Sequence, residues 1–164
     1  MNLPAPFQNM KSLKTLVLRA EQRAKELGDP ALGAEHLLLA ALEAPDGSAA
    51  RVFARVSADP DAVLGAIDEA HDAALRAVGV EPLRAGLRSS RKRGPVRLSE
   101  SAAHVLRSAA GRSRHERPRL LGAQIVAGVA ELEHGTAPRA LRVLGIDRGE
   151  LAVAADAELR AAGS

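Results

Sequence analysis

The sequence predicts an all-α fold: an eight-helix pseudo-dimer of two four-helix repeats. The first observation is an internal repeat, because Leu-Gly-Ala at residues 32–34 returns at residues 121–123, a shift of 89. Apolar positions before and after this tripeptide return at the same shift or at 88. The second is composition: 46% of residues are apolar, with two Phe and no Tyr or Trp, which favours helices packed through small side chains. The third is helical spacing of the apolar residues. Two such copies usually pack around a pseudo-twofold axis, which directs attention to the groove between them.

The first copy predicts four helices in order. Apolar residues from Leu13 to Leu27 recur at i, i+3, i+4, i+7, i+11 and i+14, and Gly-Asp-Pro at 28–30 ends this first helix. The second helix, near residues 34–44, is apolar on most faces and is expected to be central. A third, near 48–56, follows the turn at 45–47. Asp59-Pro60 is a strong start signal for the fourth.

The second copy repeats this plan. Ser99 is predicted to cap its first helix, Thr136 its short third helix, and Asp147 with Glu150 its last helix as a capping box. The first repeat is assigned to residues 9–78 and the second to residues 98–162. Between them, residues 79–97 are predicted to be a basic flexible linker, because arginines occur there without apolar periodicity.

Composition and charge exclude several classes. With no cysteine, disulfides and thiol chemistry are excluded. No apolar run approaches 18 residues and no signal peptide is recognised, so we expect a cytoplasmic protein without a membrane span. Residues 1–82 carry 8 Lys/Arg and 12 Asp/Glu, whereas residues 83–164 carry 15 and 8. The two copies therefore present opposite net charges, −4 and +7, and are not expected to bind a partner equally.

One block of sequence points to a family. Leu-Gly-Ala-Glu-His-Leu-Leu-Leu at 32–39, followed by Asp-Gly-Ser-Ala-Ala at 46–50, resembles the N-terminal repeat domain of the Clp unfoldases. The family pattern there is roughly Ile-Gly-Thr-Glu-His-Ile-Leu-Leu-Gly-Leu and then Glu-Gly-x-Ala-Ala. Residues 98–102, Leu-Ser-Glu-Ser-Ala, echo its opening Phe-Thr-x-x-Ala. The resemblance covers about residues 9–162 and is closest to the ClpC type of Gram-positive bacteria and actinobacteria.

This resemblance implies an eight-helix pseudo-dimer that is not catalytic. Such domains receive substrates and adaptors and pass them to ATPase rings stacked on the ClpP protease. The sequence contains no G-x-x-x-x-G-K-[ST] motif, so the ATPase modules are absent from it. Both a free-standing relative and an excised N-terminal domain fit this observation.

The resemblance also implies a binding residue in each copy. In ClpC-type domains the Glu of Thr-Glu-His is implicated in recognising phosphorylated arginine, and a carboxylate suits a guanidinium. Glu35 matches it in the first copy and Gln124 in the second, where an uncharged amide should hold a cation weakly. Ala34 and Ala123 replace the Thr, so both helices are expected to lack a hydroxyl cap. The alternative for Glu35 is a carboxylate that only favours the helix macrodipole; His36 is expected to be structural.

Family members also hold adaptors, and certain cyclic-peptide antibiotics, on an apolar surface near the start of each repeat. Phe7, just before the predicted first helix, and Leu98 with Ser99 in the second copy are the candidates for this surface. A frayed terminus is the alternative for Phe7. Phe53 is expected in the core.

The function predicted is a non-catalytic protein- or peptide-binding domain that recognises substrates or adaptors and modulates Clp-dependent proteolysis. No nucleophile–base pair, carboxylate dyad or metal cluster is recognised, so no enzyme activity, cofactor or metal is expected. Expected partners are substrate proteins or adaptors, including arginine-phosphorylated proteins, and Clp ATPase or protease components. Two alternatives stay open: an interaction module for an unrelated partner, and polyanion or nucleic-acid binding through the basic linker and second repeat.

Overall fold

Eight α-helices and one short pair of strands form the part of the chain that the structure describes. The computed structural model describes residues 5–82, 96–113 and 120–162, with residues 5–9 as backbone only. The first repeat holds α1 (Ala5–Leu27), β1 (Ala31–Leu32), α2 (Ala34–Leu42), α3 (Ser48–Arg55), the 3₁₀ turn η1 (Pro60–Ala62) and α4 (Val63–Ala77). The second holds β2 (Arg97–Leu98), α5 (Glu100–Ser113), α6 (Leu121–Ala130), α7 (Thr136–Val143) and α8 (Arg148–Ala161). The predicted all-α fold of eight helices is confirmed.

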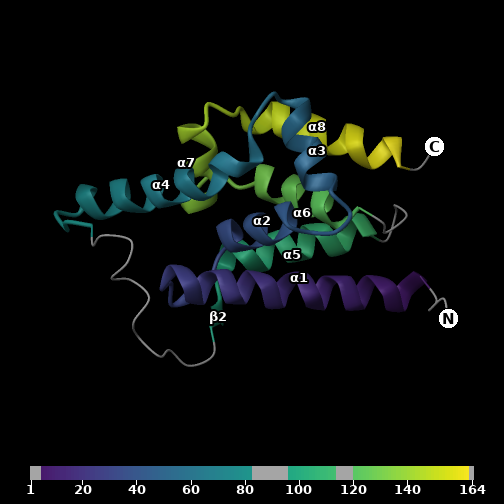
Figure 1. The fold of residues 1–164 in the computed structure, drawn as a ribbon, viewed down its shortest axis with the longest axis horizontal. Helices are drawn as coiled ribbons and strands as arrows, with labels where there is room; N and C mark the ends of the chain where they lie inside the picture. Colours follow the sequence, from purple (N-terminus) through teal and green to yellow (C-terminus); the bar gives the residue numbers. More distant parts are fainter. Residues whose placement is uncertain (1–4, 83–95, 114–119, 163–164) are drawn as a thin grey trace.

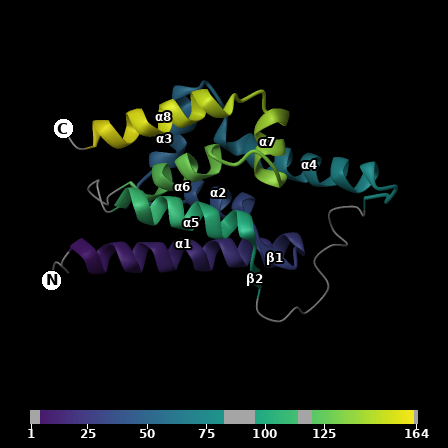
Figure 2. The same cartoon turned by 180° about the vertical axis from the view of Figure 1, so that it is seen from behind.

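The two central helices, α2 and α6, pack against each other between two outer layers (Figures 1 and 2). On one side, α1 packs on α2 and α5 packs on α6. On the other side the repeats exchange partners: α3 packs on α8, and α4 packs on α7. The third helix of each repeat therefore contacts the fourth helix of the other, so the two copies interlock.

The side chains of α2 and α6 are buried on most faces, which explains why both sequences are apolar on most faces. Leu37 and Leu38 of α2 and Ile125 and Val126 of α6 are completely buried. Phe53 of α3 is also completely buried, as expected. Burying a large aliphatic or aromatic side chain contributes about 1.5–3 kcal/mol, so this shared interior is the main source of stability.

Most predicted helix starts are confirmed by their caps. The side chain of Asp147 caps α8 by accepting a hydrogen bond from the amide of Glu150 at 2.9 Å. The side chain of Asp59 accepts one from the amide of Asp61, also at 2.9 Å, but it caps η1, and α4 begins after this turn at Val63. Ser99 Oγ accepts the amide hydrogen of Ala102 at 3.2 Å. The prediction for Thr136 is wrong, because it is the first helical residue of α7 and Gly135 takes the cap position. Gly135 has φ of 107°, a conformation that favours glycine.

The start of α1 also differs from the prediction. This helix begins at Ala5, so Phe7 lies inside it rather than before it. The interior residues of its apolar stripe, Leu16, Ala20 and Ala24, are buried as the periodicity requires. Among the described helices, none is both long enough and apolar enough to cross a bilayer.

Candidate functional site

Glu35 lies at the start of α2, where it is the second helical residue. Its side chain is 15% exposed. The carboxylate folds back over Gly33, and a Cβ on that glycine would overlap it. Gly33 therefore leaves the space that the carboxylate occupies, next to a helix N-terminus whose dipole favours negative charge.

His36 joins this helix start to the end of α1. The amide of Gly33 donates to its Nδ1 at 2.8 Å, so Nε2 carries the ring proton and donates to Asp29 Oδ2, also at 2.8 Å. The ring is completely buried. The expected structural role of His36 is confirmed. Side-chain atoms of Asp29, Glu35 and His36 that could ligate a metal ion lie within 4.8 Å of one another. Both ring nitrogens of His36 already have protein partners, so we assign this cluster a structural role in joining α1 to α2.

Leu98 and Ser99 approach the same helix start from the second repeat. Strand β2 runs parallel to β1, with Leu98 in register with Leu32, and the amide of Ser99 donates to the Leu32 carbonyl at 2.9 Å. Ser99 Oγ lies 3.0 Å from Ser101 Oγ, which accepts the amide hydrogen of Ala34 at 3.2 Å. Leu98 is 54% exposed. The strand pair therefore places an exposed aliphatic side chain and two hydroxyls beside the helix that carries Glu35.

Phe7 is not part of this group. It is the third residue of α1, and twenty residues separate it from Leu27 at the other end, about 30 Å of helix. In both ribbon views β2 lies towards the C-terminal end of α1, opposite its N-terminus (Figures 1 and 2). The structure thus separates Phe7 from Leu98.

Gln124 has a different environment from Glu35. Its side chain is 1% exposed, in the interior at the start of α6. The amides around this start are capped from the first repeat: Gly122 donates to Asp46 Oδ2 at 3.2 Å, and Ala123 donates to Ser48 Oγ at 2.8 Å. In this conformation, a ligand on the surface does not reach the Gln124 amide.

These contacts correct the expectation that both central helices lack a hydroxyl cap. Ser48 supplies a hydroxyl to α6, and Ser101 supplies one to α2. Sequence reasoning missed both because each serine lies in the opposite repeat, 75 and 67 residues away respectively. Each central helix is thus capped by the other copy.

The predicted basic surface is largely outside the described residues, including Arg84–Arg93 and Arg114–Arg119. Within the described part, Arg97 is exposed. Arg112 instead donates to Asp156 Oδ1 at 2.9 Å and to Glu131 Oε1 at 3.3 Å. Its guanidinium therefore ties α5 to the end of α6 and to the middle of α8. Polyanion binding stays a prediction.

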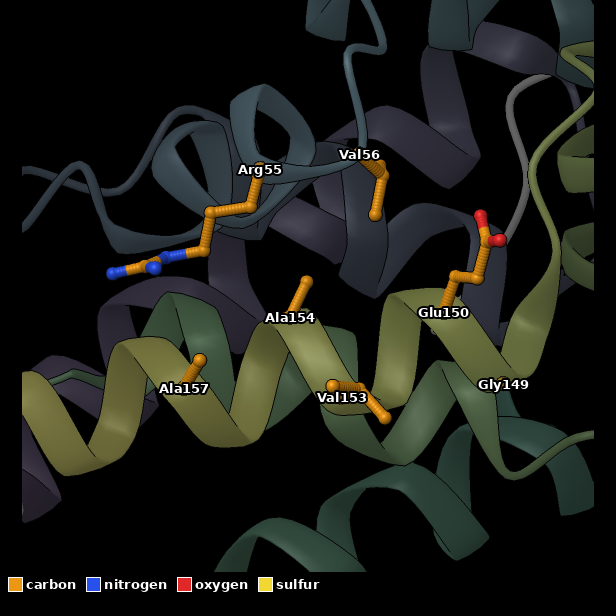
Figure 3. Close-up of a pocket in the computed structure, with 7 residues that line it drawn as sticks. All are labelled: Arg55, Val56, Gly149, Glu150, Val153, Ala154 and Ala157. Atoms are coloured by element: carbon orange, nitrogen blue, oxygen red, sulfur yellow. The ribbon is translucent and has the colours of Figure 1, made fainter.

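A second feature, which sequence reasoning did not locate, is a groove of about 520 Å³ between α3 and α8. It lies where the two repeats meet, and none of the predicted site residues lines it (Figure 3). The available signal was the pair of small residues Ala154 and Ala157 on one face of the last helix, but small residues on a helix also pack in cores.

Comparison with known proteins gives the family. A family model, the Clp repeat (R) N-terminal domain, matches residues 11–117, more than half of the chain. No curated protein sequence matches. Domains of this family are non-catalytic modules that bind substrates and adaptors of Clp ATPases. With its repeated four-helix plan and its Gly-Ala-Glu-His helix start, this chain belongs to the Clp repeat N-terminal domain family.

Proposed function

We propose that the chain receives protein segments or adaptors for Clp-dependent proteolysis, as a ClpC-type domain, through the surface formed by Glu35, Leu98 and Ser99. The observation that carries the proposal is the surface around the β1–β2 pair, which joins the repeats and puts Leu98 in register with Leu32, three residues before Glu35. It combines a partly exposed carboxylate with a half-exposed aliphatic side chain. Such a surface suits a guanidinium-bearing segment with apolar neighbours.

A cation lies next to this surface in the sequence of β2. Arg97 is exposed and immediately precedes Leu98 in β2. Guanidinium groups bind phosphate well, so an arginine-phosphorylated segment would find a partner for both halves of its modified side chain. The arrangement combines the start of α2 in the first repeat with β2 in the second, and Gln124, at the place equivalent to Glu35, is buried. We therefore propose one such site per chain, in a protein of the cytoplasm.

The test measures binding of an unfolded, arginine-phosphorylated protein to the immobilised chain. Leu98→Ser is expected to weaken binding roughly fivefold or more, because an aliphatic contact at the centre of the surface is lost. Leu18→Ser is the matched control, since Leu18 is 55% exposed on α1 against 54% for Leu98. Equal losses in both variants, or none in Leu98→Ser, would overturn the proposal.

Salt dependence separates this proposal from the polyanion alternative. Binding through a mixed apolar and polar surface should change little between about 50 and 200 mM salt, whereas binding that neutralises several phosphates weakens steeply over that range. A steep loss of affinity with added salt, for both the phosphorylated protein and a DNA duplex, would favour the polyanion alternative.

A further inference from the structure

The groove between α3 and α8 is a second surface where side chains of both repeats meet. Its lining comprises Arg55, Val56, Gly149, Glu150, Val153, Ala154 and Ala157. Figure 3 shows Ala154 and Ala157 on the side of α8 that is turned towards α3, Val56 pointing towards α8 from the end of α3, and Val153 on another side of α8. A volume of about 520 Å³ is within the range of protein ligand sites.

The centre of this α3–α8 groove is apolar and open. Ala154 and Ala157 carry only a methyl group each, so the space above this part of α8 is not filled by the helix itself. Val153 is 66% exposed, among the largest exposed fractions of any large apolar side chain in the described residues. An exposed aliphatic side chain beside an unfilled apolar hollow is typical of an interaction surface.

Opposite charges mark the two ends of the groove. Arg55 lies at one end and Glu150 at the other (Figure 3). Arg55 shares the buried carboxylate of Glu158 with Arg51: Arg55 Nε donates to Oε2 at 3.0 Å, and Arg51 Nε donates to Oε1. Of these three residues only Arg55 lines the groove, so the lining at this end is positive. The Glu150 end is negative.

The length and the lining of the groove indicate what kind of polypeptide segment would fit in it. Seven residues of α8 separate Glu150 from Ala157, about 10 Å or two helical turns. The aliphatic floor offers no hydrogen-bond partners, so an occupant should satisfy its own backbone groups, as a helix does. A helix also favours acidic residues at its N-terminus and basic residues at its C-terminus.

We propose that the α3–α8 groove binds an amphipathic helix of a partner protein, lying antiparallel to α8. Its acidic residue, near the N-terminus, faces Arg55. Two aliphatic side chains three and four positions later fill the hollow over Ala154 and Ala157, and a basic residue seven positions after the acidic one faces Glu150. This surface is separate from that of Glu35, and its occupancy does not depend on phosphoarginine.

The test uses a stapled twelve-residue helical peptide with aspartate, two leucines and lysine at that spacing. Its partner peptide has the aspartate and lysine exchanged. The native chain is expected to bind the first peptide about tenfold more tightly, since two ion pairs are replaced by two repulsive contacts. Methyl resonances of Val56, Val153 and Ala157 should shift on binding. Equal affinities for the two peptides, or no saturable binding up to about 1 mM, would overturn the proposal.

Substitutions in the chain test whether the helical peptide binds at the α3–α8 groove. Val153→Asp should reduce affinity about tenfold or more, whereas Val143→Asp, on α7 and 43% exposed, should leave it unchanged; both sites are exposed, so thermal unfolding should confirm folded variants. Glu150→Lys should reduce the ratio of affinities for the first and the exchanged peptide. Glu35→Ala should leave this ratio unchanged. A loss of binding in Val143→Asp equal to that in Val153→Asp, or a preference unchanged by Glu150→Lys, would contradict the assignment.

Discussion

Two residues at equivalent places in the repeats have acquired different environments. Glu35 keeps a charged side chain at 15% exposure, whereas Gln124 is buried at 1%. The sequence alone predicted the loss of charge at Gln124 but not its burial. The helix start that carries Gln124 is capped by Asp46 and Ser48, which reach it from the other repeat. Contacts across such a sequence separation leave no local signature, which is why this part of the site could not be predicted.

A buried carboxylate makes stability depend on pH. Burial raises the pKa of Glu158, but hydrogen bonds and charge from Arg51 and Arg55 outweigh this and lower it below its ordinary value of 4.5. A pKa lower in the folded state gives a contribution that is complete above about pH 4.5 and lost as the pH falls through the folded value. Glu158→Gln should therefore cost about 1.5–3 kcal/mol of unfolding free energy at pH 7. Urea titrations of both proteins at a series of pH values measure this, and a difference that stays constant down to pH 3 would contradict it.

The helices themselves were largely predictable, whereas their ends were only partly so. Apolar spacing located α1, α2 and α3, and Ser99 and Asp147 marked starts that the structure confirms. These signals are local, since a cap and its amide lie within three residues. The N-terminal extension of α1 to Ala5 was missed, although Met10 and Phe7 continue the apolar spacing three and six residues before Leu13. The caps of α2 and α6 were missed because they cross between repeats.

Two glycine substitutions on helices should have opposite effects. At Gly122, an added Cβ would lie 2.8 Å from Ser48 Oγ and 3.0 Å from the amide nitrogen of Ala49, so α6 and the start of α3 would be forced apart. Gly122→Ala should destabilise the fold by about 1–3 kcal/mol. Gly65 on α4 has open space around the same position, and Gly65→Ala should stabilise by roughly 0.5–1 kcal/mol. Thermal unfolding of the two variants measures both shifts. A higher unfolding temperature in Gly122→Ala would show that its contacts with α3 do not limit the packing, and a lower one in Gly65→Ala would contradict the second prediction.

At the scale of the whole molecule, the repeats interlock rather than meet at a flat face. Because α3 packs on α8 and α4 packs on α7, each repeat completes the other's core. The sequence predicted the duplication and a groove between the copies. It could not place the α3–α8 groove, since that depends on how α3 packs against the small side chains of α8. The two halves of the sequence have opposite net charges, −4 and +7. This difference agrees with two repeats that share a fold but carry different side chains at the starts of α2 and α6.

The central claim is that one repeat, through Glu35, recognises the guanidinium of a modified protein segment. The most direct measurement is a calorimetric titration of phosphoarginine into the native chain, Glu35→Ala and the exposed matched control Glu133→Ala. We expect a stoichiometry near one, a loss of affinity of about tenfold or more in Glu35→Ala from the lost charged hydrogen bonds, and no change in the control. Binding that is as tight in Glu35→Ala as in the native chain, or absent from the native chain, would contradict the account.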